Sequence, residues 1–164
     1  MVECALTAAV RGEGTADQPH AWVRADPGTA VLRELVGDFR CGALTRTLRY
    51  TITALLAGLG RRHTHEFLDS YFTHHPPDGF PAVEADRFAG YLRARPALLT
   101  AVPYLEEVLT FEHALITATL FGTSSDVRFT ADPTQILEAL DHGSLPNNPT
   151  PTRSSIRVTA AGTS

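Results

Sequence analysis

Four histidines and one glutamate lie close together in the sequence and could bind a metal ion: His63, His65, Glu66, His74 and His75. Imidazole and carboxylate groups are good ligands for iron and zinc. The spacing is unfavourable, because residues two apart on a helix point to different sides. The last two histidines directly precede Pro76 and Pro77, which end a helix. We therefore expect solvated helix ends here rather than a metal site.

A single carboxylate, that of Glu112, lies within an otherwise apolar helical stripe. A buried carboxylate needs a partner or takes a raised pKa. We expect Glu112 to be a structural buried charge, paired with Arg46 or Arg49. General acid–base catalysis is the alternative interpretation, but the sequence offers no second group beside Glu112 for such chemistry.

Patterns typical of enzymes are missing from the sequence. No serine lies in a Gly-x-Ser-x-Gly motif, and neither Cys4 nor Cys41 has a nucleophile signature. A Walker motif is impossible because all 14 basic residues are arginines. Together these observations favour a protein that binds over one that catalyses.

The composition is that of a globular domain in a reducing compartment. The chain has 164 residues, of which 43% are hydrophobic and 20% charged, so it can form a core without disulfides or metal. A net charge of -4 disfavours nonspecific binding to nucleic acid, which needs a basic surplus. No apolar run reaches the roughly 18 residues of a membrane span, and no secretory signal is evident. We expect a cytoplasmic protein that binds neither membranes nor nucleic acid.

Helical periodicity predicts a helical domain over residues 28–122, after a loose N-terminal arm over 1–27 that Trp22 attaches to the body. Glycine and proline residues separate the predicted helices. Their expected ranges are 29–42, 44–59, 63–74, 81–95 and 103–120.

The pattern changes after Gly122 and predicts a small α/β module over 123–164. Residues 126–130 and 155–159 alternate polar and apolar side chains, as half-buried strands do. Between them, Asp132 and Pro133 begin a short helix, and a polar loop covers 144–154. The expected fold is mainly α with a small α+β C-terminal module, a helical bundle followed by strand–helix–strand.

Two short strands leave main-chain groups unpaired on their outer edges. An extended peptide can pair with such an edge, and Arg128 and Arg157 would then attract acidic residues of that peptide. Equally, the strands can simply cap the helical bundle. The residues alone leave both interpretations open.

Several segments, taken in order, resemble the partner proteins of multinuclear non-heme iron-dependent oxidases. These partners are encoded beside enzymes that modify ribosomally made peptides, and the methanobactin maturation pair is the best-known type. The resemblance covers about residues 63–159. It is carried by Phe88-Ala89-Gly90-Tyr91-Leu92, Pro96, Pro103-Tyr104-Leu105, Phe111-Glu112-His113-Ala114, Val127-Arg128-Phe129, Asp132-Pro133, Ile136-Leu137, Leu140, Gly143 and Leu145-Pro146.

The resemblance implies a noncatalytic subunit that forms a heterodimer or larger complex with a TIM-barrel oxidase. Its C-terminal part would be similar to a peptide recognition element and would hold the leader of a precursor peptide as an added strand. The iron ions and their ligands would belong to the oxidase, so this chain would need no cofactor of its own. The implied peptide-binding residues are Val127, Arg128, Phe129, Thr130, Ile156, Arg157 and Val158. The C-terminal module is shorter than in longer members, so the leader or another strand would complete its sheet.

Two other functions remain as alternatives. One is a small helical metalloenzyme that uses Glu112 and the histidines between His63 and His75. The other is a transcriptional regulator, which the acidic composition disfavours. For the oxidase partner, we expect exposed apolar residues of the first two helices to form the contact between subunits.

Overall fold

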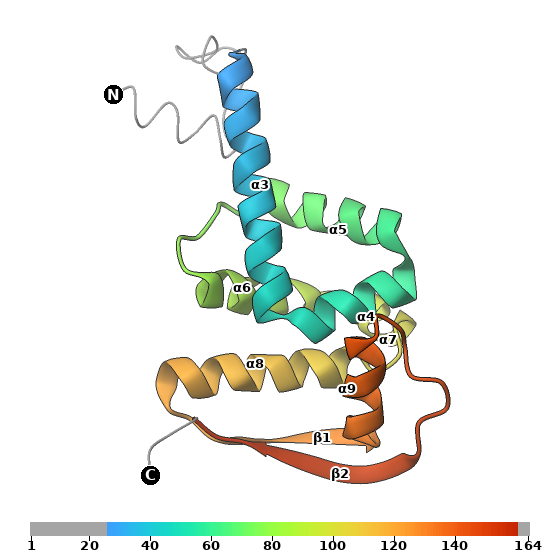
Figure 1. Ribbon diagram of the computed structural model, residues 1–164. Helices are drawn as coiled ribbons and strands as arrows, with labels where there is room; N and C mark the ends of the chain where they lie inside the picture. The colour runs from blue at the N-terminus through green and yellow to red at the C-terminus, as the bar shows by residue number, and fades with distance from the viewer. Residues whose placement is uncertain (1–25, 161–164) are drawn as a thin grey trace.

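The computed structural model describes residues 26–160 (Figure 1). The predicted arm over 1–27, including Trp22, therefore lies almost entirely outside the described residues. The described part is mainly helical with a small two-stranded antiparallel sheet near its C-terminal end, as the sequence predicts.

Six helices precede the sheet within the described residues, and a seventh lies between its strands. The first six are α3 (Pro27–Thr47), α4 (Arg49–Leu59), α5 (Arg61–His74), α6 (Pro81–Arg93), α7 (Pro96–Ala101) and α8 (Leu105–Phe121). They are followed by β1 (Ser125–Ala131), α9 (Pro133–Asp141) and β2 (Pro151–Val158). Figure 1 shows α8 running between the sheet and the layer formed by α4 and α6.

The first helix is longer than predicted, because it continues through Gly42 to Thr47. A glycine inside a helix costs about 1 kcal/mol relative to alanine. The residues after it, Ala43 and Leu44, are buried, and their burial offsets that cost. The helix ends instead at Leu48, whose backbone (φ -121°, ψ 50°) leaves the helical region.

The prediction missed α7, because it treated Pro96 as the end of one helix and Pro103 as the start of the next. Pro96 occupies the first turn of α7, a position that favours proline since its missing N–H would be unpaired there anyway. Tyr104, with a positive φ of 62°, then forms the turn before α8.

The second strand begins at Pro151 and not at Ser155, so the predicted loop over 144–154 is too long. Pro151 is opposite Ala131 in the sheet. Proline is tolerated at the first residue of an edge strand. Residues 151–154 therefore belong to β2, although their composition is typical of a loop.

The hydrophobic core is continuous from the helices to the sheet. Leu44, Leu55 and Phe88 of the helical part belong to the same buried cluster as Phe129 of β1 and Ile136 of α9. The predicted division into a helical domain over 28–122 and a module over 123–164 stays a prediction, and the core extends across that boundary.

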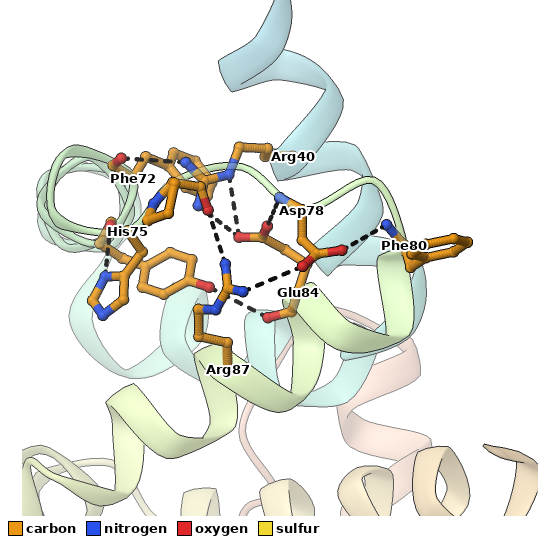
Figure 2. A network of polar contacts seen from close by, with 9 residues as sticks. Arg40, Phe72, His75, Asp78, Phe80, Glu84 and Arg87 are labelled. Atoms are coloured by element: carbon orange, nitrogen blue, oxygen red, sulfur yellow. Dashed lines mark hydrogen bonds and ion pairs between the residues drawn. The ribbon is translucent and has the colours of Figure 1, made fainter. Parts of the chain in front are cut away.

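A buried ion pair joins α3 to α6 (Figure 2). The Arg40 guanidinium donates to Glu84 Oε1 through Nη2 at 2.7 Å and Nε at 3.2 Å, and the two side chains are 4% and 1% exposed. Glu84 Oε2 accepts the Asp78 backbone N–H at 3.0 Å, and Arg40 Nη1 donates to the Phe72 carbonyl at 3.2 Å. Because every oxygen of the buried carboxylate has a donor, the pair fixes α3, the end of α5 and the α5–α6 connection together.

Candidate peptide-binding edge

The two strands pair antiparallel, with Val127 opposite Ile156 and Arg128 opposite Ser155. A register irregularity falls between the Phe129–Ser154 and Ala131–Pro151 pairs, where β2 has one residue more than β1. Within residues 26–160 each strand has the other as its strand neighbour. Each therefore has a second edge without a strand partner.

The apolar site residues predicted from the sequence face the helices. Val127, Phe129 and Val158 are buried, and Ile156 is half-buried against the core. The Phe129 ring makes an edge-on contact with Phe111 of α8, with centroids 6.1 Å apart. These side chains hold the sheet in place, so a peptide added at the edge of one strand would pair with the main chain of that strand and would not contact these side chains.

Arg157 already has a carboxylate partner on the same sheet. It is directly opposite Asp126 and donates to its two oxygens, from Nε at 2.9 Å and from Nη2 at 3.0 Å. This hydrogen bonding lowers the pKa of the Asp126 carboxyl and raises the pKa of the Arg157 guanidinium. The expectation that Arg157 is available to an acidic peptide needs this correction, because a ligand would have to displace Asp126.

Arg128 and Arg153 are the other cations of the exposed sheet face. Side chains 153, 155 and 157 are exposed and alternate along β2 with half-buried ones, and Arg128 is exposed on β1. Neither Arg128 nor Arg153 forms an ion pair with any residue in the range 26–160. Sequence reasoning missed Arg153 because it assigned this residue to a loop. The available signal was the spacing of two that relates Arg153 and Ser155 to Arg157 of the predicted strand.

The outer edge of β1 is partly occupied by α8. Thr130 donates its backbone N–H to Glu107 Oε2 at 3.2 Å and its hydroxyl to Oε1 at 2.6 Å. Thr130, a predicted peptide-binding residue, is therefore engaged within the chain. The outer edge of β2 lacks such a contact among the described residues, which makes it the better candidate for pairing with a peptide.

Glu112 is buried as expected, at 4% exposure, but its partners are not those predicted. Its carboxylate accepts the backbone N–H groups of Tyr50 at 2.7 Å and Thr51 at 2.8 Å. Arg49 instead pairs with Asp141 of α9. Glu112 thus caps the N-terminus of α4, which has no side-chain cap of its own. Burial raises the pKa of Glu112 to about 7, with the hydrogen bonds from Thr51 and Tyr50 acting in the opposite direction.

Three of the histidines predicted to be solvated helix ends contact main-chain carbonyls one turn earlier in the chain, and for His63 that carbonyl belongs to Leu59, the last residue of α4. His63 and His74 contact the carbonyl oxygens four residues earlier, at 3.2 Å and 2.7 Å, and His75 does so at 2.9 Å. Glu66 pairs with Arg62 one turn away. Across residues 26–160, no three His, Cys, Asp or Glu side chains converge in a way that could hold a metal ion.

A hollow with a volume of about 590 Å³ lies between α3 and α5. Its lining mixes apolar residues such as Leu68 and Phe72 with charged ones such as Asp38 and Asp69. Arg40 also lines it, but its guanidinium is held by Glu84 and Phe72. The two helices that line it, α3 and α5, lie on the side of the molecule away from the sheet (Figure 1).

The first helix also has an exposed apolar face. Leu32 is 40% exposed, and three further residues on α3 are more than half exposed: Val31, Leu35 and Phe39. These four residues are called the α3 stripe below. On α4, Leu56 is also exposed, at 39%.

Comparison of the chain with protein-family models, with curated proteins and with solved structures found no match. Of the helices in the described part, none has the length and hydropathy needed to cross a lipid bilayer.

Proposed function

We propose that this chain is a noncatalytic, peptide-binding subunit of a multinuclear non-heme iron oxidase that modifies ribosomally made peptides. The observation that carries the proposal is the outer edge of β2, which has no strand partner among residues 26–160, on a sheet that packs one face against the helices. Because the sheet is already held in place by the helices, its edge can offer main-chain hydrogen bonds to an extended segment. The sheet does not have to fold when the segment binds.

In this proposal the leader of the precursor adds a third strand beside β2, in the manner of a peptide recognition element. The added strand places the modifiable part of the precursor close to the oxidase, so that part needs little affinity of its own. The iron and its ligands belong to the oxidase, and this cytoplasmic chain contributes positioning and no bond-making step.

The α3 stripe is the proposed contact with the oxidase. Contiguous exposed apolar residues on one helix typically mark an interaction surface. The helix that carries the stripe, α3, extends away from the sheet (Figure 1), so one chain can bind the oxidase and the leader at the same time. The Arg40–Glu84 pair, in the second half of α3, holds this helix to the body.

Co-elution tests the subunit contact. The purified chain and the oxidase encoded beside it should elute together, and the variant Leu35→Glu with Phe39→Glu should elute separately. As a control, Leu120→Glu with Phe121→Glu places two charges on exposed apolar residues of α8, away from α3 and α4, and should leave co-elution unchanged. Separate elution of the unmodified chain would reject the subunit assignment.

Backbone methylation of the leader tests strand addition. Main-chain hydrogen bonds of an added strand come from alternate residues, so two leader peptides N-methylated at alternate residues, in opposite phases, should differ. One should lose binding to the complex and the other should retain most of it. Equal binding of both peptides would contradict pairing along an edge, and absence of binding by the unmethylated leader would reject the proposed function.

Metal analysis separates this proposal from the metalloenzyme alternative. Stoichiometric iron or zinc in the chain purified alone would favour an enzyme using its own histidines. Salt-dependent binding to duplex DNA would instead favour the regulator.

A further inference from the structure

The exposed face of the sheet has an excess of positive charge in a chain that is acidic overall. The strand residues of this face include three arginines, Arg128, Arg153 and Arg157, and one carboxylate, Asp126. One further carboxylate, that of Glu107 on α8, reaches the end of β1 and is bound by Thr130. Because Asp126 is taken by Arg157, two guanidinium groups remain without a partner within residues 26–160. The whole chain has a net charge of -4, so this face is opposite in sign to the average surface.

The two remaining arginines lie close to one another around Ser155. Arg128 is directly opposite Ser155 on the neighbouring strand, and Arg153 lies two residues from Ser155 on the same exposed face. Like charges placed near each other on a sheet reduce its stability. A bound carboxylate would neutralise the positive charge of both guanidinium groups and reduce their repulsion.

Ser155 leaves space for a long side chain to reach the edge. A strand added beside β2 would lie about 10 Å from β1, two strand spacings away. The small Ser155 side chain is the one that separates Arg128 from that edge, and the flexible arginine stem can extend over it. Arg153 is on β2 itself and needs no such reach.

We propose that the outer edge of β2 selects acidic extended peptides, and that Arg128 and Arg153 together bind a Glu or Asp side chain of the added strand next to Ser155. The proposal rests on strand addition at β2 from the proposed function and adds the chemical class of the peptide. Guanidinium groups bind carboxylates through paired, charge-assisted hydrogen bonds. An acidic side chain on the exposed face of the added strand would point to the same side of the sheet as the two guanidinium groups. Side chains next to it in the peptide sequence would point to the other face.

Two synthetic peptides of about ten residues, one alternating Thr with Glu and one alternating Thr with Gln, are sufficient probes. Both place every second side chain on one face when extended, and they differ only in charge. Fluorescence anisotropy with the full chain at low salt should show about tenfold tighter binding of the Glu peptide, a ratio that one or two charge-assisted hydrogen bonds produce. The preference should weaken as salt is raised.

Matched variants identify the residues that are responsible. Arg128→Gln with Arg153→Gln should abolish the preference for the Glu peptide. The control, Asp126→Asn with Arg157→Gln, removes one charge of each sign from the same face and should preserve the preference. Circular dichroism should show the same fold for both variants.

The outcomes separate this inference from the proposed function. No preference for the Glu peptide in the unmodified chain, or a preference that survives in the Arg128 and Arg153 variant, overturns the inference. These probes require no oxidase, so a failed co-elution with the oxidase would reject the proposed function without altering the result for acidic peptides.

Discussion

Replacement of Glu112 by Gln should remove a pH dependence from the stability of the fold. The pKa of this carboxyl is raised from 4.5 to about 7 in the folded chain, chiefly by burial. An acid whose pKa is higher in the folded state stabilises that state fully below its unfolded pKa, and this contribution is lost as the pH rises through the folded pKa. The unmodified chain should therefore lose stability between about pH 4.5 and pH 7.

The size of the effect follows from the difference between the two pKa values. That difference is about 2.5, and each pKa unit corresponds to about 1.4 kcal/mol, so the loss of stability is about 3–4 kcal/mol. The amide that replaces the carboxyl in the Glu112→Gln variant cannot ionise, yet its oxygen can still accept the N–H of Tyr50 or Thr51. The stability of this variant relative to the unmodified chain should therefore increase by about 3–4 kcal/mol as the pH rises from about 4.5 to about 8.

Urea unfolding followed by circular dichroism at several pH values measures this difference. The control is Glu106→Gln, which neutralises an exposed carboxylate on the same helix and should leave the pH profile nearly unchanged. Parallel stability profiles for the unmodified chain and Glu112→Gln between about pH 5 and pH 8 would refute the reasoning, because they would show that Glu112 binds its proton equally in both states.

Two further substitutions test the packing by the same unfolding measurement. Arg40→Leu should lower the free energy of unfolding by about 3–5 kcal/mol, because it leaves the Glu84 carboxylate, 1% exposed, buried without its partner. The control Arg62→Ala breaks an exposed pair and should lower it by less than about 1 kcal/mol. Similar losses for the two variants would contradict this prediction. Gly58→Ala should destabilise by about 1–3 kcal/mol although alanine favours helices, since the new Cβ would lie 2.8 Å and 2.9 Å from the Val102 methyl groups. Val102→Ala in the same chain should recover much of that loss, and a stabilising Gly58→Ala would show that Val102 moves freely.

The sequence predicted the secondary structure best where local signals agreed. Pro76 and Pro77 end α5 close to the expected position. Asp132 caps α9 by accepting the Thr134 N–H at 2.9 Å, and Pro133 follows it. These signals act between residues that are neighbours along the chain, so they are readable before the fold is known.

The candidate site was predicted less completely. The alternation around Val127 and Phe129 correctly gave a half-buried strand. Which arginines stay without a carboxylate depended on the register, since Arg157 lies opposite Asp126 although the two are far apart in sequence. Arg153 was missed because the prolines and serines around it are typical of a loop.

By itself, the sequence determined the order of the longer helices and the two strands, though not the short helix α7, because periodicity, caps and prolines act over a few residues. The tertiary structure alone decided where α3 gives way to α4. Leu48 provides no side-chain cap for α4. The carboxylate that accepts hydrogen bonds from the first turn of α4 is that of Glu112, on α8, about 60 residues later in the chain. This contact forms only when α4 and α8 pack together. Burying the Glu112 carboxylate or the first amide groups of α4 without a hydrogen-bond partner would cost free energy, so the contact fixes both helices in place.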